Sequence, residues 1–187
     1  MKKILALLLC VILCCFPIAA CANSSASAPI VEMEMADGGI VRIQLDPEAA
    51  PVTVENFIGL VNDGFYDGLI FHRVIEGFMV QGGDPTGQGN GGSGTKIEGE
   101  FAAGGHDNPI SHNRGVISMA RSGNDYNSAS SQFFIVHEDS TFLDGEYAAF
   151  GKVTEGMDVV DAIAAVETGE NDRPLTDVVI ASIRVVE

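Results

Sequence analysis

The sequence predicts a mainly β domain with two helices, folded as a closed antiparallel barrel or as a sandwich. Short apolar runs recur along the chain, and several alternate with polar residues as half-buried strands do. Two other segments place apolar residues at helical spacing, while 82–113 is rich in Gly, Ser, Thr and Asn and is expected to be mostly loop. Many short strands with two helices favour a barrel with helices at its ends, although these patterns leave the sandwich open.

Residues 1–20 are expected to be a signal peptide. Lys2 and Lys3 precede an apolar run over 4–22, which is typical of a charged n-region followed by an h-region. The run is also long enough to be considered as a membrane span. The tetrapeptide Ile18-Ala19-Ala20-Cys21 favours the signal peptide, because it resembles the bacterial lipoprotein box, in which small residues precede a lipidated cysteine.

Cys21 is therefore the predicted acylation site, and palmitate-type acyl chains there would anchor the protein to the membrane. Residues 21–29 are then a polar tether and 30–187 the domain. An uncleaved helical anchor and ordinary secretory cleavage are the alternatives, and each also places the domain outside the cytoplasmic membrane. All four cysteines lie in the first 21 residues, which excludes a disulfide framework and a cysteine metal cluster in the domain.

Length and net charge limit the classes of function that the protein could have. The 187 residues amount to one domain, and the formal net charge is −16. Such acidity argues against nucleic acid and against direct binding of anionic lipid headgroups. We interpret it as a source of solubility.

The first elements follow from local patterns. Segments 31–35 and 41–45 alternate apolar and polar residues around Asp37-Gly38-Gly39, which predicts a β-hairpin. A helix is expected to open at Pro51 and end near Gly64, a left-handed cap. Its buried face is predicted from residues spaced i, i+3, i+4 and i+7, which are Val54, Phe57, Ile58 and Val61.

The later elements are short. Strands are predicted over 116–120, 133–136 and 149–153, a second helix around 157–164, and a final β run over 178–186. Segment 87–92 formally matches a dinucleotide-binding GxGxxG, but no βαβ unit surrounds it. We interpret it as a flexible surface loop.

The stretch 71–84 contains most of the side chains that could act in binding or catalysis. Its pattern predicts two short strands joined at Glu76-Gly77. Alternation would place Phe71 and Arg73 on one face, with His72 on the other as a structural residue. Met79 and Gln81 would share a face in the second strand. An apolar pocket with one cation and one amide at its edge is predicted.

This stretch resembles the signature of cyclophilin-type peptidyl-prolyl isomerases. Four further motifs follow in the family's order, and the resemblance spans nearly all of the chain after its first thirty or so residues. The motifs are Gly115-Val116-Ile117-Ser118-Met119-Ala120, Ser131-Gln132-Phe133-Phe134-Ile135, Phe142-Leu143-Asp144-Gly145 and Phe150-Gly151-Lys152-Val153.

The resemblance implies an eight-stranded barrel capped by two α-helices, with a site on its outer face that isomerises X–Pro bonds without metal or cofactor. The implied catalytic residues are Arg73, Phe78 and Gln81, with Arg73 stabilising the twisted peptide. The implied substrate-binding residues are Met79, Ala120, Arg121, Gln132, Phe134, Phe142, Leu143 and Tyr147, with Ala120 and Arg121 acting mainly through backbone groups. Partners would be proline-containing exported polypeptides, and the protein would be a monomer.

The chain departs from the family at four positions. Phe142 stands where tryptophan is common, Tyr147 where histidine is, Arg121 where asparagine is, and Glu76 where proline is. The loss of an indole N–H predicts weak binding of the family's inhibitor, cyclosporin, with turnover retained.

Other functions fit the sequence less well. A peptide-binding module or holdase could use the same groove without turnover, but it would not need Arg73. A solute-binding lipoprotein would need two lobes, for which the chain is too short. The histidines lack metal-site spacing, and Ser130-Ser131 has no context typical of a serine hydrolase.

Overall fold

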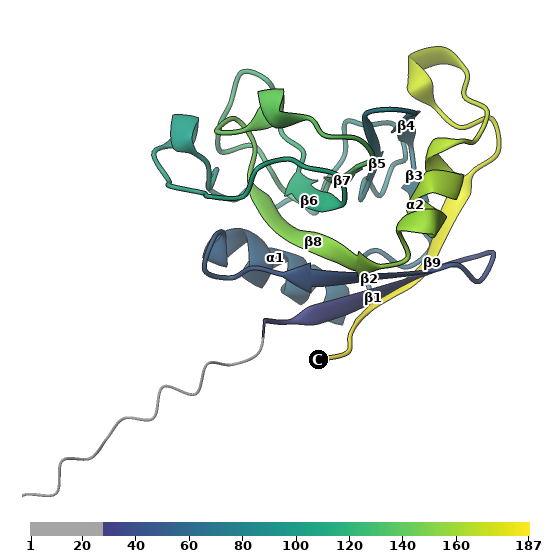
Figure 1. The fold of residues 1–187 in the computed structure, drawn as a ribbon, viewed down its shortest axis with the longest axis horizontal. Helices are drawn as coiled ribbons and strands as arrows, with labels where there is room; N and C mark the ends of the chain where they lie inside the picture. Colours follow the sequence, from purple (N-terminus) through teal and green to yellow (C-terminus); the bar gives the residue numbers. More distant parts are fainter. Residues whose placement is uncertain (1–27) are drawn as a thin grey trace, which may run out of the picture.

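The computed structural model describes residues 28–187, which form one curled antiparallel sheet with two helices (Figure 1). The helices are α1 (Pro51–Asn62) and α2 (Met157–Ala164), and three short 3₁₀ turns are η1 (Ala102–Gly104), η2 (Thr141–Leu143) and η3 (Glu170–Asp172). The strands are β1 (Ile30–Met35), β2 (Ile40–Leu45), β3 (Ile70–Phe71), β4 (Arg73–Ile75), β5 (Met79–Gly82), β6 (Val116–Met119), β7 (Phe133–Val136), β8 (Ala149–Glu155) and β9 (Val178–Val185).

The sheet closes into a barrel through His72. The strand order is β3-β9-β1-β2-β8-β6-β7-β5-β4, so β3 and β4 stand at its two ends. Only His72 separates them along the chain. The prediction of a barrel rather than a sandwich is therefore confirmed. The nine strands become the expected eight if β3 and β4 are counted as one interrupted strand.

The β1–β2 hairpin shows why the alternating segments form strands. Its inward residues are fully or almost fully buried, whereas Glu32 and Arg42 face each other across the outer side. Their ion pair measures 2.9 Å. Gly38 supplies the positive φ of +89° that the turn requires.

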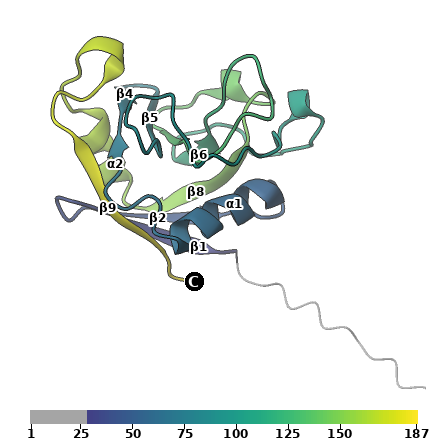
Figure 2. The same ribbon diagram turned by 180° about the vertical axis from the view of Figure 1, so that it is seen from behind.

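Both predicted helices are present, on opposite sides of the barrel (Figures 1 and 2). In α1, Val54, Phe57 and Val61 are buried as expected, and Ile58 is partly buried. Gly64 follows the helix end with φ +67°. No helix within 28–187 has the length and apolarity needed to cross a bilayer.

Two apolar clusters occupy opposite faces of the sheet. Inside the barrel, Phe57 packs its ring 5.1 Å from Tyr66, 5.1 Å from Phe150 and 5.7 Å from Phe133. A smaller cluster lies on the outer face of β5, β6, β7 and β8, and its buried members are Met79, Val116, Phe134, Val136, Leu143 and Ala149. An apolar cluster on the outer face of a barrel is a natural place for a binding site.

Candidate active site

The register of β4, β5 and β7 brings the central side chains onto one face. Arg73 pairs with Gln81, which pairs in turn with Phe134. Met79 pairs with Val136 in the neighbouring row. Because cross-strand partners share a face of the sheet, the cation, the amide and two apolar side chains lie together on the outer side.

These side chains line a cavity of about 610 Å³. Nine of the predicted site residues contribute to it: Arg73, Phe78, Met79, Gln81, Ala120, Arg121, Phe134, Leu143 and Tyr147. Its apolar part is tightly packed, with the Tyr147 ring edge-on to Phe134 at 5.8 Å. The cavity therefore combines a compact apolar wall with a charged rim.

Gln132 and Phe142, the other two predicted residues, lie at the edge of this cavity. Gln81 donates a hydrogen bond from Nε2 to Oε1 of Gln132 at 2.9 Å, and Gln132 donates to the Gly91 carbonyl at 2.9 Å. Phe142 is 73% exposed, and its ring lies 5.6 Å from that of Phe78. Gln132 thus orients the Gln81 amide, while Phe142 offers an open apolar surface beside the pocket.

The prediction that Phe71 shares the face of Arg73 is wrong. Phe71 is fully buried inside the barrel, with its ring 6.1 Å from Phe133. His72, expected to face away, lines the cavity instead. The alternation fails because the chain leaves its pairing with β9 at Phe71 and begins its pairing with β5 at Arg73.

His72 is buried beside the cavity wall. Neither ring nitrogen has a hydrogen-bond partner among the described residues, and the residue is 6% exposed. Burial lowers the pKa of this imidazole, partly offset by the nearby Asp84 carboxylate. The ring is therefore neutral near pH 7.

Two loops complete the cavity, and neither was predicted to do so. Gly87, Gln88 and Gly89 belong to the glycine-rich segment interpreted as a surface loop. Asp84 organises that segment, because its carboxylate accepts hydrogen bonds from the backbone N–H groups of Thr86, Gly89 and Gly91. The Asp-x-Thr pattern is a signal that could have indicated this ordered turn.

The second loop is η3 and its flanks, which contribute Glu170, Asn171, Asp172 and Arg173. Asp172 accepts a hydrogen bond from Nε of Arg73 at 3.2 Å. Arg73 and Asp172 are 41% and 45% exposed, so water screens the pair. No periodicity or motif in the sequence pointed to this contact.

Arg121 lines the cavity, yet its guanidinium forms hydrogen bonds with other residues of the protein. Its side chain is 5% exposed and donates from Nε to the Glu146 carbonyl at 2.8 Å. The terminal nitrogens of the guanidinium donate further hydrogen bonds to the Glu146 carboxylate at 3.1 Å and to the carbonyl groups of Ser122 and Gly123. A role for Arg121 through backbone groups is compatible with this arrangement, because the side chain is already occupied.

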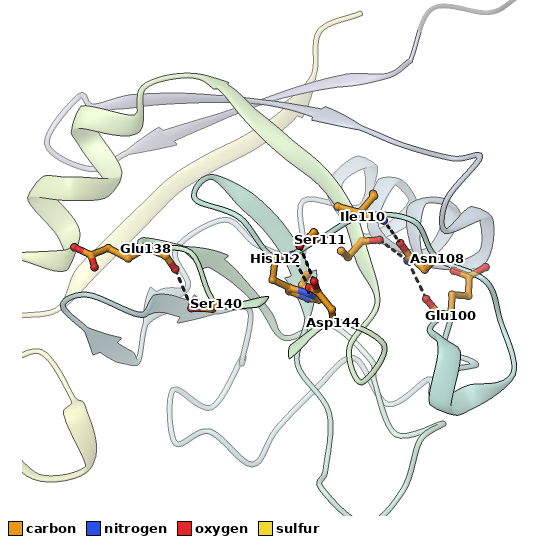
Figure 3. A network of polar contacts seen from close by, with 10 residues as sticks. Glu100, Asn108, Ile110, Ser111, His112, Glu138, Ser140 and Asp144 are labelled. Atoms are coloured by element: carbon orange, nitrogen blue, oxygen red, sulfur yellow. Dashed lines mark hydrogen bonds and ion pairs between the residues drawn. The ribbon is translucent and has the colours of Figure 1, made fainter. Parts of the chain in front are cut away.

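A polar network centred on the buried His112 adjoins Phe134 of the apolar wall, and Figure 3 shows its contact between His112 and Asp144. His112 contacts Asp144 through Nδ1 at 2.9 Å and Ser118 through Nε2 at 3.0 Å. His112 and Ser118 are fully buried, so this Ser-His-Asp order cannot reach a substrate. The His112 ring stacks at 6.1 Å from Phe134, which makes the network a support for the pocket.

Among residues 28–187, no three His, Cys, Asp or Glu side chains gather closely enough to hold an ion. The arrangement instead offers hydrogen bonding and charge beside an apolar surface. It can bind a peptide and stabilise a shift of electron density within it.

The chain resembles known proteins over nearly all of its described length. The family model for "Cyclophilin type peptidyl-prolyl cis-trans isomerase/CLD" matches residues 30–185. Peptidyl-prolyl cis-trans isomerase B of Bacillus subtilis (strain 168) is 52% identical over 122 residues, which are 65% of this chain and 81% of the relative. Peptidyl-prolyl cis-trans isomerase-like 3 of Rattus norvegicus is 43% identical over 154 residues, 80% of this chain and 91% of the relative.

A solved structure shows the same architecture. It is a cyclophilin type peptidyl-prolyl cis-trans isomerase of Cryptosporidium parvum, crystallised in the presence of the dipeptide Ala-Pro. It superposes with a TM-score of 0.77 at 30% sequence identity, covering 84% of this chain and 99% of that one.

Proposed function

This chain belongs to the cyclophilin-type peptidyl-prolyl cis-trans isomerase family, and we propose that Arg73 is the catalytic cation with which it rotates X–Pro bonds in exported polypeptides. One observation carries the proposal. Arg73 and Gln81 line the same cavity as the apolar Met79 and Phe134. A polar rim on an apolar pocket suits a peptide bond that precedes a proline ring.

The reaction needs charge placed correctly rather than a nucleophile. The barrier to rotation is about 20 kcal/mol, because the peptide C–N bond is partly double. Twisting returns lone-pair density to the prolyl nitrogen, and a catalyst must bind that twisted form better than either planar form. Arginine stays ionised and presents a rigid fork of donors. One preorganised donor of this kind is worth roughly 3 kcal/mol.

The apolar wall would hold the proline ring. Met79, Phe134 and Leu143 are each at least 92% buried by their neighbours, so the wall is formed before a substrate arrives. Gln81 would hold the substrate backbone, with its amide oriented by Gln132. The relative from Cryptosporidium parvum, crystallised in the presence of Ala-Pro, supports a ligand of this class.

The test is an isomerisation assay on a short Ala-Pro peptide, with a fragment that starts after Cys21. Arg73→Ala is expected to slow catalysis roughly 100-fold, as loss of a charge-stabilising donor does. Arg42→Ala is the matched control, because Arg42 is an exposed arginine on the β1–β2 hairpin. A fast Arg73→Ala enzyme would disprove the role of the cation.

A holdase is the alternative, and the same experiment separates it. A folded wild-type domain that binds proline peptides without accelerating their exchange would be a binding module. For such a module, Arg73→Ala would leave peptide affinity largely unchanged. Peptide binding is measured by titration calorimetry in parallel with the rate.

We also propose that the protein works outside the cytoplasmic membrane, acylated at Cys21. The support is the lipoprotein-like tetrapeptide at 18–21, which lies outside the described residues. Cells fed an azide-bearing palmitate analogue should label the wild type and Cys15→Ser equally. Cys21→Ser should lose the label and leave the membrane fraction. A labelled Cys21→Ser protein would contradict acylation at this position.

A further inference from the structure

The catalytic cation is held by a carboxylate from a distant part of the chain. Nε of Arg73 donates to Oδ2 of Asp172 at 3.2 Å, across 99 positions of sequence. Within residues 28–187, Asp172 is the one side chain with which Arg73 forms an ion pair or hydrogen bond. A bond at Nε leaves both terminal nitrogens of the guanidinium for other partners.

The loop that carries Asp172 is a built structure, which we call the strap and define as residues 167–175. Its two arms are joined by backbone hydrogen bonds, from Gly169 N–H to the Arg173 carbonyl at 2.8 Å and from Leu175 N–H to the Glu167 carbonyl at 2.9 Å. The bridge between Thr168 and Pro174 lies between these bonds. The strap is therefore a closed hairpin-like loop.

Arg173 fastens the strap to the rest of the site. Its guanidinium donates to the Gly87 carbonyl in the opposite cavity wall and to Asp177 at 3.2 Å. At the tip, Asn171 and Asp172 have φ values of 58° and 60°, which non-glycine residues seldom adopt. The closed arms and the Arg173 anchor hold this tip against Arg73.

We propose that Asp172 is a positioning residue for isomerisation, which fixes the Arg73 fork so that its terminal N–H groups face the prolyl peptide. A free arginine side chain samples many rotamers, and a substrate would have to order it. A carboxylate on Nε removes part of that cost before binding. This inference rests on the proposed function, because it gives Asp172 a role only if Arg73 is catalytic.

Stability and catalysis should respond differently. Because the ion pair is nearly half exposed, its loss should hardly change the melting temperature. Catalysis is more sensitive, since a displacement of about 1 Å in a catalytic group can cost on the order of 100-fold in rate. A catalytic effect without a stability effect is thus the expected signature.

The test compares Asp172→Ala, Asp172→Glu and Glu167→Ala in the full-length protein, purified in detergent, on an Ala-Pro peptide. Glu167→Ala is the matched control, because Glu167 is an exposed glutamate of the same strap that neither lines the cavity nor pairs with Arg73. We expect Asp172→Ala to lower kcat roughly 10-fold with KM nearly unchanged. Asp172→Glu should recover much of kcat, and Glu167→Ala should resemble the wild type.

A double-mutant cycle completes the test. In an Arg73→Ala background, Asp172→Ala should have no further effect on kcat, because its target is gone. The inference is overturned if Asp172→Ala matches or exceeds the wild-type rate, if Glu167→Ala slows the enzyme equally, or if the effects of Arg73→Ala and Asp172→Ala simply add. An active wild type with a slow Arg73→Ala and a normal Asp172→Ala sinks only this inference. An inactive wild type sinks the proposed function as well.

Discussion

The guanidinium carbon of Arg121 lies 4.8 Å from the centre of the Tyr147 ring. The same guanidinium lies 4.9 Å from the ring of Tyr126 and 5.2 Å from that of Phe101. Tyr147 in turn packs edge-on against Phe134 in the pocket. A cation enclosed by three aromatic rings therefore supports one wall of the candidate active site.

Replacement of Arg121 should weaken both the fold and the pocket. Cation–π contacts of desolvated groups are worth up to about 2 kcal/mol each, so Arg121→Ala should lower the free energy of unfolding by roughly 2 kcal/mol or more. Arg121→Lys should recover little, since an ammonium lacks the planar fork. Urea unfolding measures the change, and the exposed Arg42→Ala serves as control. Equal losses for both variants would show that the enclosure contributes nothing.

Glu100 caps α1 from another part of the chain. Ala50 at the N-cap offers no side-chain hydrogen bond. The Glu100 carboxylate accepts hydrogen bonds instead from Val52 N–H at 2.9 Å and Thr53 N–H at 2.8 Å.

Glu100→Ala should therefore destabilise the protein by about 1 to 3 kcal/mol, the cost of leaving buried donors unpaired. Thermal or urea unfolding measures the loss in the free energy of unfolding. Glu98→Ala is the control, because Glu98 is exposed two residues away. If both variants unfold alike, Glu100 does not act as a cap.

His112 should make stability depend on pH. Burial lowers the pKa of this imidazole below its ordinary value near 6.5, although Asp144 partly opposes the shift. Between the folded and unfolded pKa values the unfolded chain binds more protons, so the free energy of unfolding falls as the pH drops below about 6.5.

The slope of unfolding free energy against pH should become shallower in His112→Gln. Some slope should remain, because burial also lowers the pKa of His72. His106→Gln is the comparison variant, and NMR titration of the His112 ring gives its folded pKa directly. A His112 ring that titrates above 6.5 would reverse the expected sign.

We expect Phe142 to limit the affinity of the protein for cyclosporin. Its ring is 73% exposed beside Phe78 and carries no hydrogen-bond donor. Phe142→Trp should tighten cyclosporin binding roughly 10-fold, the worth of about one net hydrogen bond, while isomerase activity stays similar. Calorimetric titration tests this. Phe142→Leu provides an apolar control, and equal affinity of all three proteins would refute the role of the indole N–H.

Much of the fold was predictable because its signals are local. The alternation in β1 and β2 and the helical spacing in α1 act over a few residues, and the structure confirms both. The closure of the barrel at His72 was not predictable from alternation. The closure depends on which strands pair, since Phe71 pairs with β9 and Arg73 pairs with β5.

The sequence by itself determined the central part of the pocket, because Arg73, Met79 and Gln81 lie close together on two paired strands and belong to family motifs. Only the tertiary structure decided what holds that pocket. Arg73 meets Asp172 across 99 positions, and Thr53 meets Glu100 across 47. Such contacts leave no periodicity in the chain, because they depend on where two loops arrive once the barrel has closed.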